Sequence, residues 1–193
     1  MRKIRRALLS VPLLAATSLA VQAQAPGDPA PRIAAQREAI AVLDRMNGTW
    51  RGPAWIISPT GERHTTTQTE RVGSFLDGTV KVIEGRGYGA DGAVVFNAFA
   101  IISYDPDRRS YGMRSYARGH AGDFTITPTA DGLTWEIPAG PAVIRYTAVI
   151  RDGTWHEFGE RIVPGQEPIR FIEFTLTRVG DTEWPVAGAV PHR

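Results

Sequence analysis

The stretch VIRYTAVIRDGTWHEFGERI, residues 143–162, decides the fold of this chain. Two runs rich in β-branched and aromatic residues flank Asp152-Gly153, and an Asp-Gly dipeptide in that setting is the strongest short-range signal of a β-hairpin. A two-residue turn there places Ile150 opposite Trp155, because paired positions sum to 305. The face that carries these two residues is the more apolar one, so we expect it to point into the protein.

The same turn signal recurs along the rest of the chain. Asp-Gly dipeptides start at positions 77, 91, 131 and 152, and Gly- or Pro-containing breaks supply the other turns. Every connection is too short for a crossover helix, which makes the sheet an antiparallel meander, and ten long strands expose an edge unless the sheet closes. The sequence therefore predicts an all-β, ten-stranded antiparallel up-and-down barrel, with a β-sandwich as the alternative. The expected strands are 49–58, 63–76, 79–89, 93–104, 110–117, 123–128, 133–138, 142–151, 154–163 and 169–179.

The turns at 77-78 and 91-92 place a set of polar side chains on one face of three neighbouring strands. That face is apolar at one end and polar at the other, so we expect it to line the barrel interior and hold a ligand. Because Arg71 and Arg86 outnumber Glu84, the ligand should carry an anionic head group. The alternative is a solvated outer face with Arg71 and Glu84 as a cross-strand ion pair. The candidate ligand-binding residues are Arg71, Glu84, Arg86, Tyr88, Asn97 and Phe99.

The N-terminus has the features of a secretory signal peptide. Residues 2–6 are basic, residues 7–20 form an apolar stretch too short to span a bilayer, and Val21 and Ala23 are the small residues that signal peptidase requires. We expect cleavage after Ala23 and a periplasmic or secreted protein, with no membrane span in the mature chain. The absence of cysteine is compatible with an oxidising compartment.

The remaining segments complete the predicted domain organisation. Residues 24–31 are rich in Ala and Pro and predict a flexible tether. Residues 32–46 predict an amphipathic helix that ends near Asn47-Gly48 and covers the closed end of the barrel. The barrel then occupies residues 47–180, and residues 181–193 form a C-terminal tail.

The first and last strands carry a family resemblance. Gly48-Thr49-Trp50 resembles the Gly-x-Trp signature of the calycins, the superfamily of lipocalins and fatty-acid-binding proteins, and Arg178 matches the arginine of its last strand. The resemblance implies that Arg178 packs over Trp50 and closes the barrel, as a cation over an aromatic face. With Ser103-Tyr104-Asp105 and residues 174–178, the chain is similar to uncharacterised bacterial lipocalin-like domains, many of them secreted.

Two relatives within that superfamily imply different ligands. Residues 48–52 also resemble the opening of the haem-binding nitrobindins, but Ala54 replaces their third glycine and residues 169–180 hold no histidine. Fatty-acid-binding proteins carry a two-helix lid between their first two strands, for which residues 59–62 are too few. We therefore expect no haem and no other cofactor.

Charge and motif content narrow the function further. Four of the 22 basic residues lie in the leader, and without them 18 basic residues face 20 acidic ones, so no nucleic-acid partner is expected. The four histidines are scattered singly, which gives no metal site, and no nucleophile motif is present. The sequence predicts a barrel that binds a small apolar or amphipathic molecule. The alternatives are an enzyme that uses Glu84, Arg86 and Tyr88, and a filled barrel that serves as a structural or interaction domain.

Overall fold

The computed structural model describes residues 28–184. The predicted signal peptide, its cleavage site after Ala23, residues 24–27 of the predicted tether and residues 185–193 lie outside the described residues. No helix of the described part has the length and apolarity needed to cross a bilayer.

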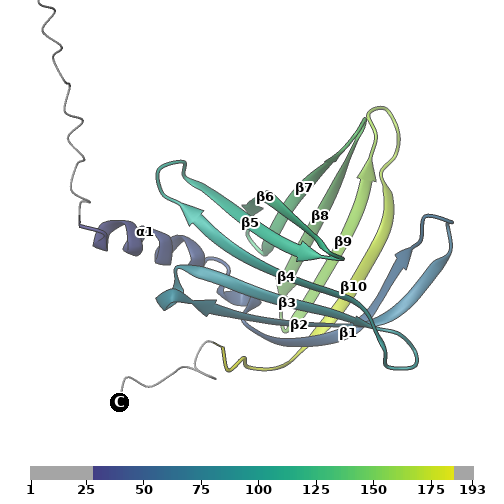
Figure 1. Cartoon of the computed structure of the whole chain (residues 1–193), viewed down its shortest axis with the longest axis horizontal. Coiled ribbons are helices and arrows are strands. Elements are labelled where there is room, and N and C mark those ends of the chain that lie inside the picture. The colour runs from purple at the N-terminus through teal and green to yellow at the C-terminus, as the bar shows by residue number, and fades with distance from the viewer. Residues whose placement is uncertain (1–27, 185–193) are drawn as a thin grey trace, which may run out of the picture.

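Ten strands form one closed antiparallel barrel in up-and-down order, as predicted (Figure 1). Each strand pairs with its neighbours in sequence, and β1 pairs with β10 to close the sheet. The bounds agree closely with the expected ranges, except that β6 begins at His120, just after a turn at 118-119. The strands are β1 (Gly48–Ile57), β2 (Arg63–Phe75), β3 (Val80–Tyr88), β4 (Val94–Asp105), β5 (Ser110–Ala117), β6 (His120–Pro128), β7 (Gly132–Ala139), β8 (Ala142–Arg151), β9 (Thr154–Ile162) and β10 (Ile169–Gly180).

The hairpin registers predicted from the Asp-Gly turns at 77-78, 91-92 and 152-153 are present. Ile150 pairs with Trp155, Arg71 pairs with Glu84, and Val82 pairs with Ile101. Ile150 and Trp155 are buried in the barrel core, so the predicted inward face of β8 and β9 is confirmed. Side chains alternate between the two faces along each strand, which makes one buried residue enough to orient its whole strand.

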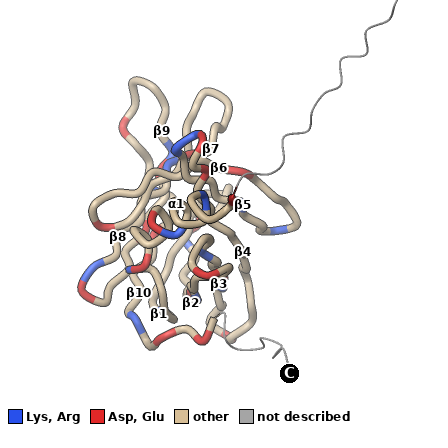
Figure 2. The backbone as a smooth tube through the Cα atoms, turned by 90° about the vertical axis from the view of Figure 1, so that its left-hand side faces the viewer, with Lys and Arg blue, Asp and Glu red and all other residues tan. Residues whose placement is uncertain are grey.

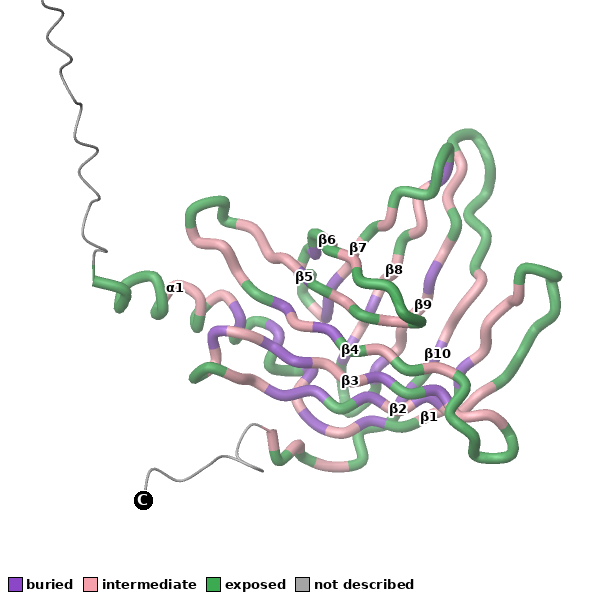
Figure 3. The backbone as a smooth tube through the Cα atoms, viewed as in Figure 1, coloured by how far each residue is buried: buried purple, intermediate pink, exposed green. Residues whose placement is uncertain are grey.

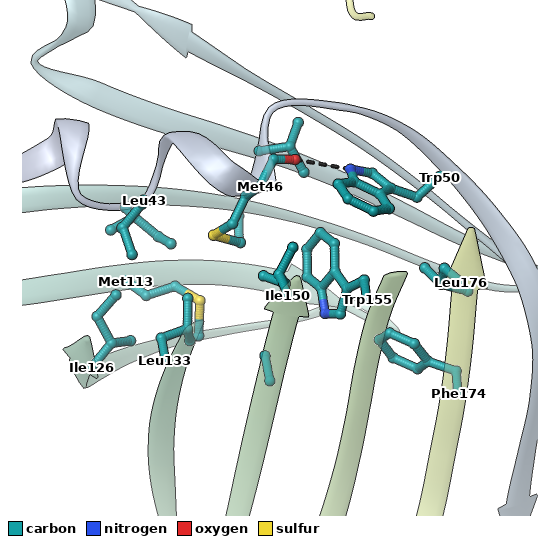
Figure 4. Close-up of a cluster of buried hydrophobic side chains, with 14 of the residues drawn as sticks. Leu43, Met46, Trp50, Met113, Ile126, Leu133, Ile150, Trp155, Phe174 and Leu176 are labelled. Carbon is teal, nitrogen blue, oxygen red and sulfur yellow. Dashed lines mark hydrogen bonds between the residues drawn. The ribbon is translucent and has the colours of Figure 1, made fainter. Parts of the chain in front are cut away.

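The helix at the closed end is shorter than predicted. The α-helix α1 spans Ala30–Ala41, and a separate 3-10 turn, η1, spans Asp44–Met46. The chain tightens between them, and Leu43 and Met46 become almost fully buried under the barrel wall (Figure 4). Ile33, near the start of α1, is instead 40% exposed, so the closed end is filled by the end of α1 and by η1 rather than by one continuous helix.

The end of α1 and η1 together form the plug of the barrel, and a buried lysine holds this plug in place. The side chain of Lys81 on β3 is fully buried, and its Nζ donates hydrogen bonds to Asp44 Oδ1 at 2.6 Å, to Asn47 Oδ1 at 2.7 Å and to Ser74 Oγ at 2.8 Å. Burial lowers the pKa of the Lys81 ammonium, and Asp44 opposes that shift. All three donor positions of the ammonium are therefore satisfied, and η1 is tied to β2 and β3.

Trp50 and Arg178 are direct partners across the closing pair of strands. Trp50 is buried, donates from Nε1 to the Met46 carbonyl oxygen at 2.9 Å, and meets the Trp155 ring edge-on at 5.7 Å (Figure 4). Arg178 donates to the Asn47 carbonyl oxygen and pairs with Asp181, and no cation–aromatic contact of the described residues joins it to Trp50. The expectation that Trp50 and Arg178 are neighbours in the closing strand pair is therefore confirmed. The expected packing of the arginine over the indole ring is not found, because Arg178 donates to the Asn47 carbonyl oxygen instead.

The barrel loosens toward the end away from α1. β6 and β7 pair through three residue pairs only, all of them in the half near the plug, the outermost being Ile126 with Trp135. The loops at this end are exposed, whereas buried residues gather in the half next to the plug (Figure 3). Seen from the α1 side, positive and negative residues lie interspersed over strands and turns (Figure 2).

Candidate ligand site in the barrel interior

An aromatic wall lines the middle of the barrel interior. The rings of Trp135 on β7 and Tyr146 on β8 stack at a centroid distance of 4.6 Å and an interplanar angle of 6°. Both residues lie on the same face as the buried Leu133 and Ala148, and both remain partly exposed. The stacked pair therefore presents apolar surface above the filled floor of the barrel.

A bare glycine and a β-bulge shape this wall. Tyr146 lies opposite Gly159, where a Cβ atom would lie 2.8 Å from the tyrosine ring. The pairing of β10 with β9 shifts register between Arg170 and Ile172, which leaves Phe171 as an extra residue. The Phe171 ring consequently meets the Tyr146 ring edge-on at 6.0 Å and extends the wall.

Two carboxyl groups face the same interior. Glu70 on β2 is only 8% exposed, and its Oε1 accepts a hydrogen bond from the Gln68 amide at 2.7 Å. The carboxyl group lies over Gly85, where a Cβ atom would come within 2.7 Å of Oε1. Glu157 on β9 is half-buried, and its Oε2 accepts from Trp155 Nε1 at 3.1 Å.

The protein environment keeps both carboxyl groups protonated at higher pH than usual. Burial raises the pKa of Glu70 to about 7, although its hydrogen bond from Gln68 opposes the shift. Burial also raises the pKa of Glu157 to about 8, and the nearby negative charge of Glu70 adds to the effect. The two groups titrate as a coupled pair, so that near pH 7 the interior holds less than two negative charges.

The stability of the protein should fall as the pH rises from about 5 to 8. In this range the unfolded chain has both carboxyl groups ionised, while the folded chain still binds protons at Glu70 and Glu157, so each rise in pH favours unfolding. One such group contributes a slope of about 1.4 kcal/mol per pH unit while it is protonated only in the folded state. Urea unfolding at several pH values measures the slope, and the double variant Glu70→Gln/Glu157→Gln should flatten it. A slope that is unchanged in this variant would contradict the assignment.

The structure places the predicted binding residues on the outside of the barrel, which corrects the expected orientation. Glu84 accepts hydrogen bonds from Arg71 at 2.9 Å and from Arg86 at 2.7 Å. Both arginine side chains are nearly half exposed, and Phe99 is 39% exposed. The cross-strand ion pair of the alternative interpretation is therefore present, and the anionic preference loses its basis because Glu84 occupies both arginines.

These outer residues nevertheless lie close together. Glu84, Arg86, Asn97 and Phe99 line one open hollow of about 470 Å³, together with Tyr116 and residues 117–121. Tyr88 and Arg71 share their face of the sheet but do not line the hollow. Trp135, Tyr146 and Phe171 of the aromatic wall do not line this hollow.

The sequence contained the signals for the interior residues in part. The Asp152-Gly153 register places Tyr146, Glu157 and Gly159 on the inward face together. The register of β2 with β3 sets Glu70 opposite Gly85, on the face opposite to Arg71. A glutamate facing a bare glycine on the inner wall was the available signal, because the missing side chain leaves room for a carboxyl group.

Comparison with known proteins bears on the fold. No model of a known protein family matches this chain, and no curated protein matches it. The crystal structure of Rv2717c from M. tuberculosis is similar in fold, with a TM-score of 0.53 and 13% sequence identity, over 74% of this chain and 96% of that one. The S-type phycobiliprotein lyase CPES from Guillardia theta gives a TM-score of 0.48 and 10% identity, over 73% of this chain and 90% of that one. The likeness to Rv2717c concerns the fold alone, which in this chain is a closed antiparallel up-and-down barrel.

Proposed function

We propose that this chain is an exported barrel protein that binds a small amphipathic molecule in the barrel interior. Export rests on the basic and apolar segments of residues 1–23 and on the small residues before position 24. Binding rests above all on the stacked pair of Trp135 and Tyr146, because both rings lie on the inward face of the barrel and keep accessible surface there.

The arrangement of the interior supports this proposal. The half of the barrel next to the plug is filled by side chains such as Trp155, Ile150 and Leu133, so a ligand would rest on an apolar floor. The aromatic wall and the two carboxyl groups follow above the floor, and β6 and β7 separate beyond Ile126. An apolar site with a few convergent polar groups is the usual form of a small-molecule pocket.

Replacing Trp135 by alanine should weaken binding of octanol, an uncharged amphipathic probe, by about tenfold, because the ligand loses most of one aromatic face. Titration calorimetry with octanol measures the affinity. Trp55→Ala is the matched control, since Trp55 lies on the outer face of β1 under the Arg63 guanidinium. Octanol that binds the wild type and Trp135→Ala equally well, or that fails to bind the wild type, would contradict the proposal.

A further inference from the structure

We infer that the barrel interior selects a molecule with a cationic head group, such as a primary amine, which Glu70 and Glu157 hold while the aromatic wall packs against its apolar body. This inference rests on the proposed function, because it names the class of ligand for the same site. It reverses the anionic preference expected from the sequence.

Glu70 is a buried carboxyl group without a cationic partner. More than nine-tenths of the residue is buried, and its Oε1 accepts a hydrogen bond from Gln68. No hydrogen bond within residues 28–184 reaches Oε2, which is therefore not fully enclosed, because no fully buried polar side-chain atom of these residues lacks a partner. Fourteen ion pairs join charged side chains of residues 28–184, and none includes Glu70 or Glu157. Carboxyl groups so deeply placed are normally paired, and an incoming cation would supply the missing partner.

Glu157 brings the second carboxyl group next to the aromatic wall. Glu157 and Gly159 are successive inward-facing residues of β9, two positions apart in the sequence, and Tyr146 packs against that glycine. The negative charge of Glu157 adds to burial in raising the pKa of Tyr146, which places the two groups within electrostatic reach. An ammonium held at Glu157 would therefore lie near the faces of Tyr146 and Trp135, where the ring electrons attract a cation.

The glycine at position 85 keeps space for this head group. Its missing side chain allows the Glu70 carboxyl group to lie back against β3 instead of projecting across the barrel. Two other charged groups act on this part of the interior. Glu84 adds negative charge near Glu70, and Arg118, in the β5–β6 turn, acts on Tyr146. The Arg118 guanidinium carbon lies 5.7 Å from the centre of the Phe96 ring.

Three probes of one chain length separate the ligand classes. Titration calorimetry at pH 8 with octylamine, octanol and octanoic acid should give an affinity for the amine at least about tenfold above that for the alcohol, with the acid weakest, because a charge-assisted hydrogen bond inside the barrel favours only the amine. Glu157→Gln should lower the octylamine affinity by about tenfold or more and leave that for octanol within about twofold. Glu160→Gln is the control, since it removes a carboxylate from the outer face of the same strand, where Glu160 pairs with Arg170.

The results distinguish failure of this inference from failure of the proposed function. Equal affinity for amine and alcohol, or an equal loss in Glu157→Gln and Glu160→Gln, would overturn the cationic preference and leave interior binding intact. Absence of binding by all three probes would overturn both. If Glu157→Gln does not fold, Glu70→Gln provides the same comparison, and circular dichroism checks the fold of each variant.

Proton release gives an independent readout. With pKa values of about 7 and about 8, the pair retains protons at pH 7, and an ammonium bound beside it should displace up to about one of them into the buffer. Calorimetry at pH 7 in phosphate and in Tris should therefore give different apparent heats for octylamine and the same heats for octanol. Identical heats for octylamine in the two buffers would show that the carboxyl pair does not contact the amine.

Discussion

Trp50→Ala should lower the free energy of unfolding by about 3 to 5 kcal/mol, the range found for large aromatic side chains removed from a protein core. Trp50 is 2% exposed and contacts both the plug and β9, two strands away around the barrel, through the Met46 carbonyl oxygen and the Trp155 ring. Removing the indole opens a cavity at the point where three parts of the chain meet, and it leaves that carbonyl group without its donor.

Urea unfolding followed by circular dichroism measures this effect, with the dependence on urea compared to confirm that the unfolded states are alike. Trp55→Ala serves as the control, because Trp55 is on the outer face and its loss should cost far less. If the two variants were equally destabilised, the closed end would not depend on Trp50 as the structure indicates.

The second large effect concerns the buried ammonium of Lys81. Removing its partner Asp44 should destabilise the protein more than removing the lysine charge itself. Asp44→Ala removes the one carboxylate among residues 28–184 that binds Lys81. It leaves a charged group with zero exposed side-chain area, whose remaining partners in that range are Asn47 and Ser74. We expect a loss of about 2 to 3 kcal/mol, below the 3 to 5 kcal/mol typical of a fully buried broken pair because Asp44 is itself 57% exposed.

Lys81→Met should be much milder, at about 1 kcal/mol or less. Methionine keeps most of the buried chain length, and Asp44 can be hydrated once the ammonium is gone. Thermal unfolding of the two variants under the same conditions compares their losses of stability directly. A larger loss for Lys81→Met than for Asp44→Ala would mean that the ion pair, rather than burial of the ammonium, dominates this site.

Local signals predicted the architecture of the barrel well. Each Asp-Gly turn fixes the register of its two strands, and register in a meander determines which residues are neighbours, as the pairs Ile150–Trp155 and Arg71–Glu84 show. The closing pair of Trp50 and Arg178 followed from the resemblance at the two ends of the barrel.

The orientation of β2, β3 and β4 could not be predicted from the same signals. Both faces of these strands mix apolar and polar residues: the inner face carries Glu70 and Lys81, and the outer face carries Phe75 and Val82. Two tertiary contacts account for this reversal of the usual pattern. Lys81 binds the plug inside the barrel, and the C-terminal segment covers the outer face.

That cover is provided by Trp184. Its ring meets the Phe75 ring edge-on at 5.7 Å and lies 3.9 Å from the Arg71 guanidinium carbon, over the bare backbone of Gly73. The predicted tail is thus in contact with the barrel at its first residues. The sequence of the predicted tail, which has few β-formers, does not indicate the face of the barrel on which it packs. Without that cover, the apolar side chains of Phe75 and Val82 suggested an interior position.

The pairing of β1 with β10 also dictates how the chain can fold. Every other strand pair joins neighbours in sequence, so hairpins can form one after another as the chain leaves the ribosome. Ala54, in contrast, meets its partner Phe174 only after the 119 residues between them have been made. Until then β1 and the newest strand present unpaired backbone edges, which are templates for association with other chains. The last step of barrel formation therefore depends on the C-terminal strand, and premature termination before Ile169 would leave a sheet with two open edges rather than a smaller barrel.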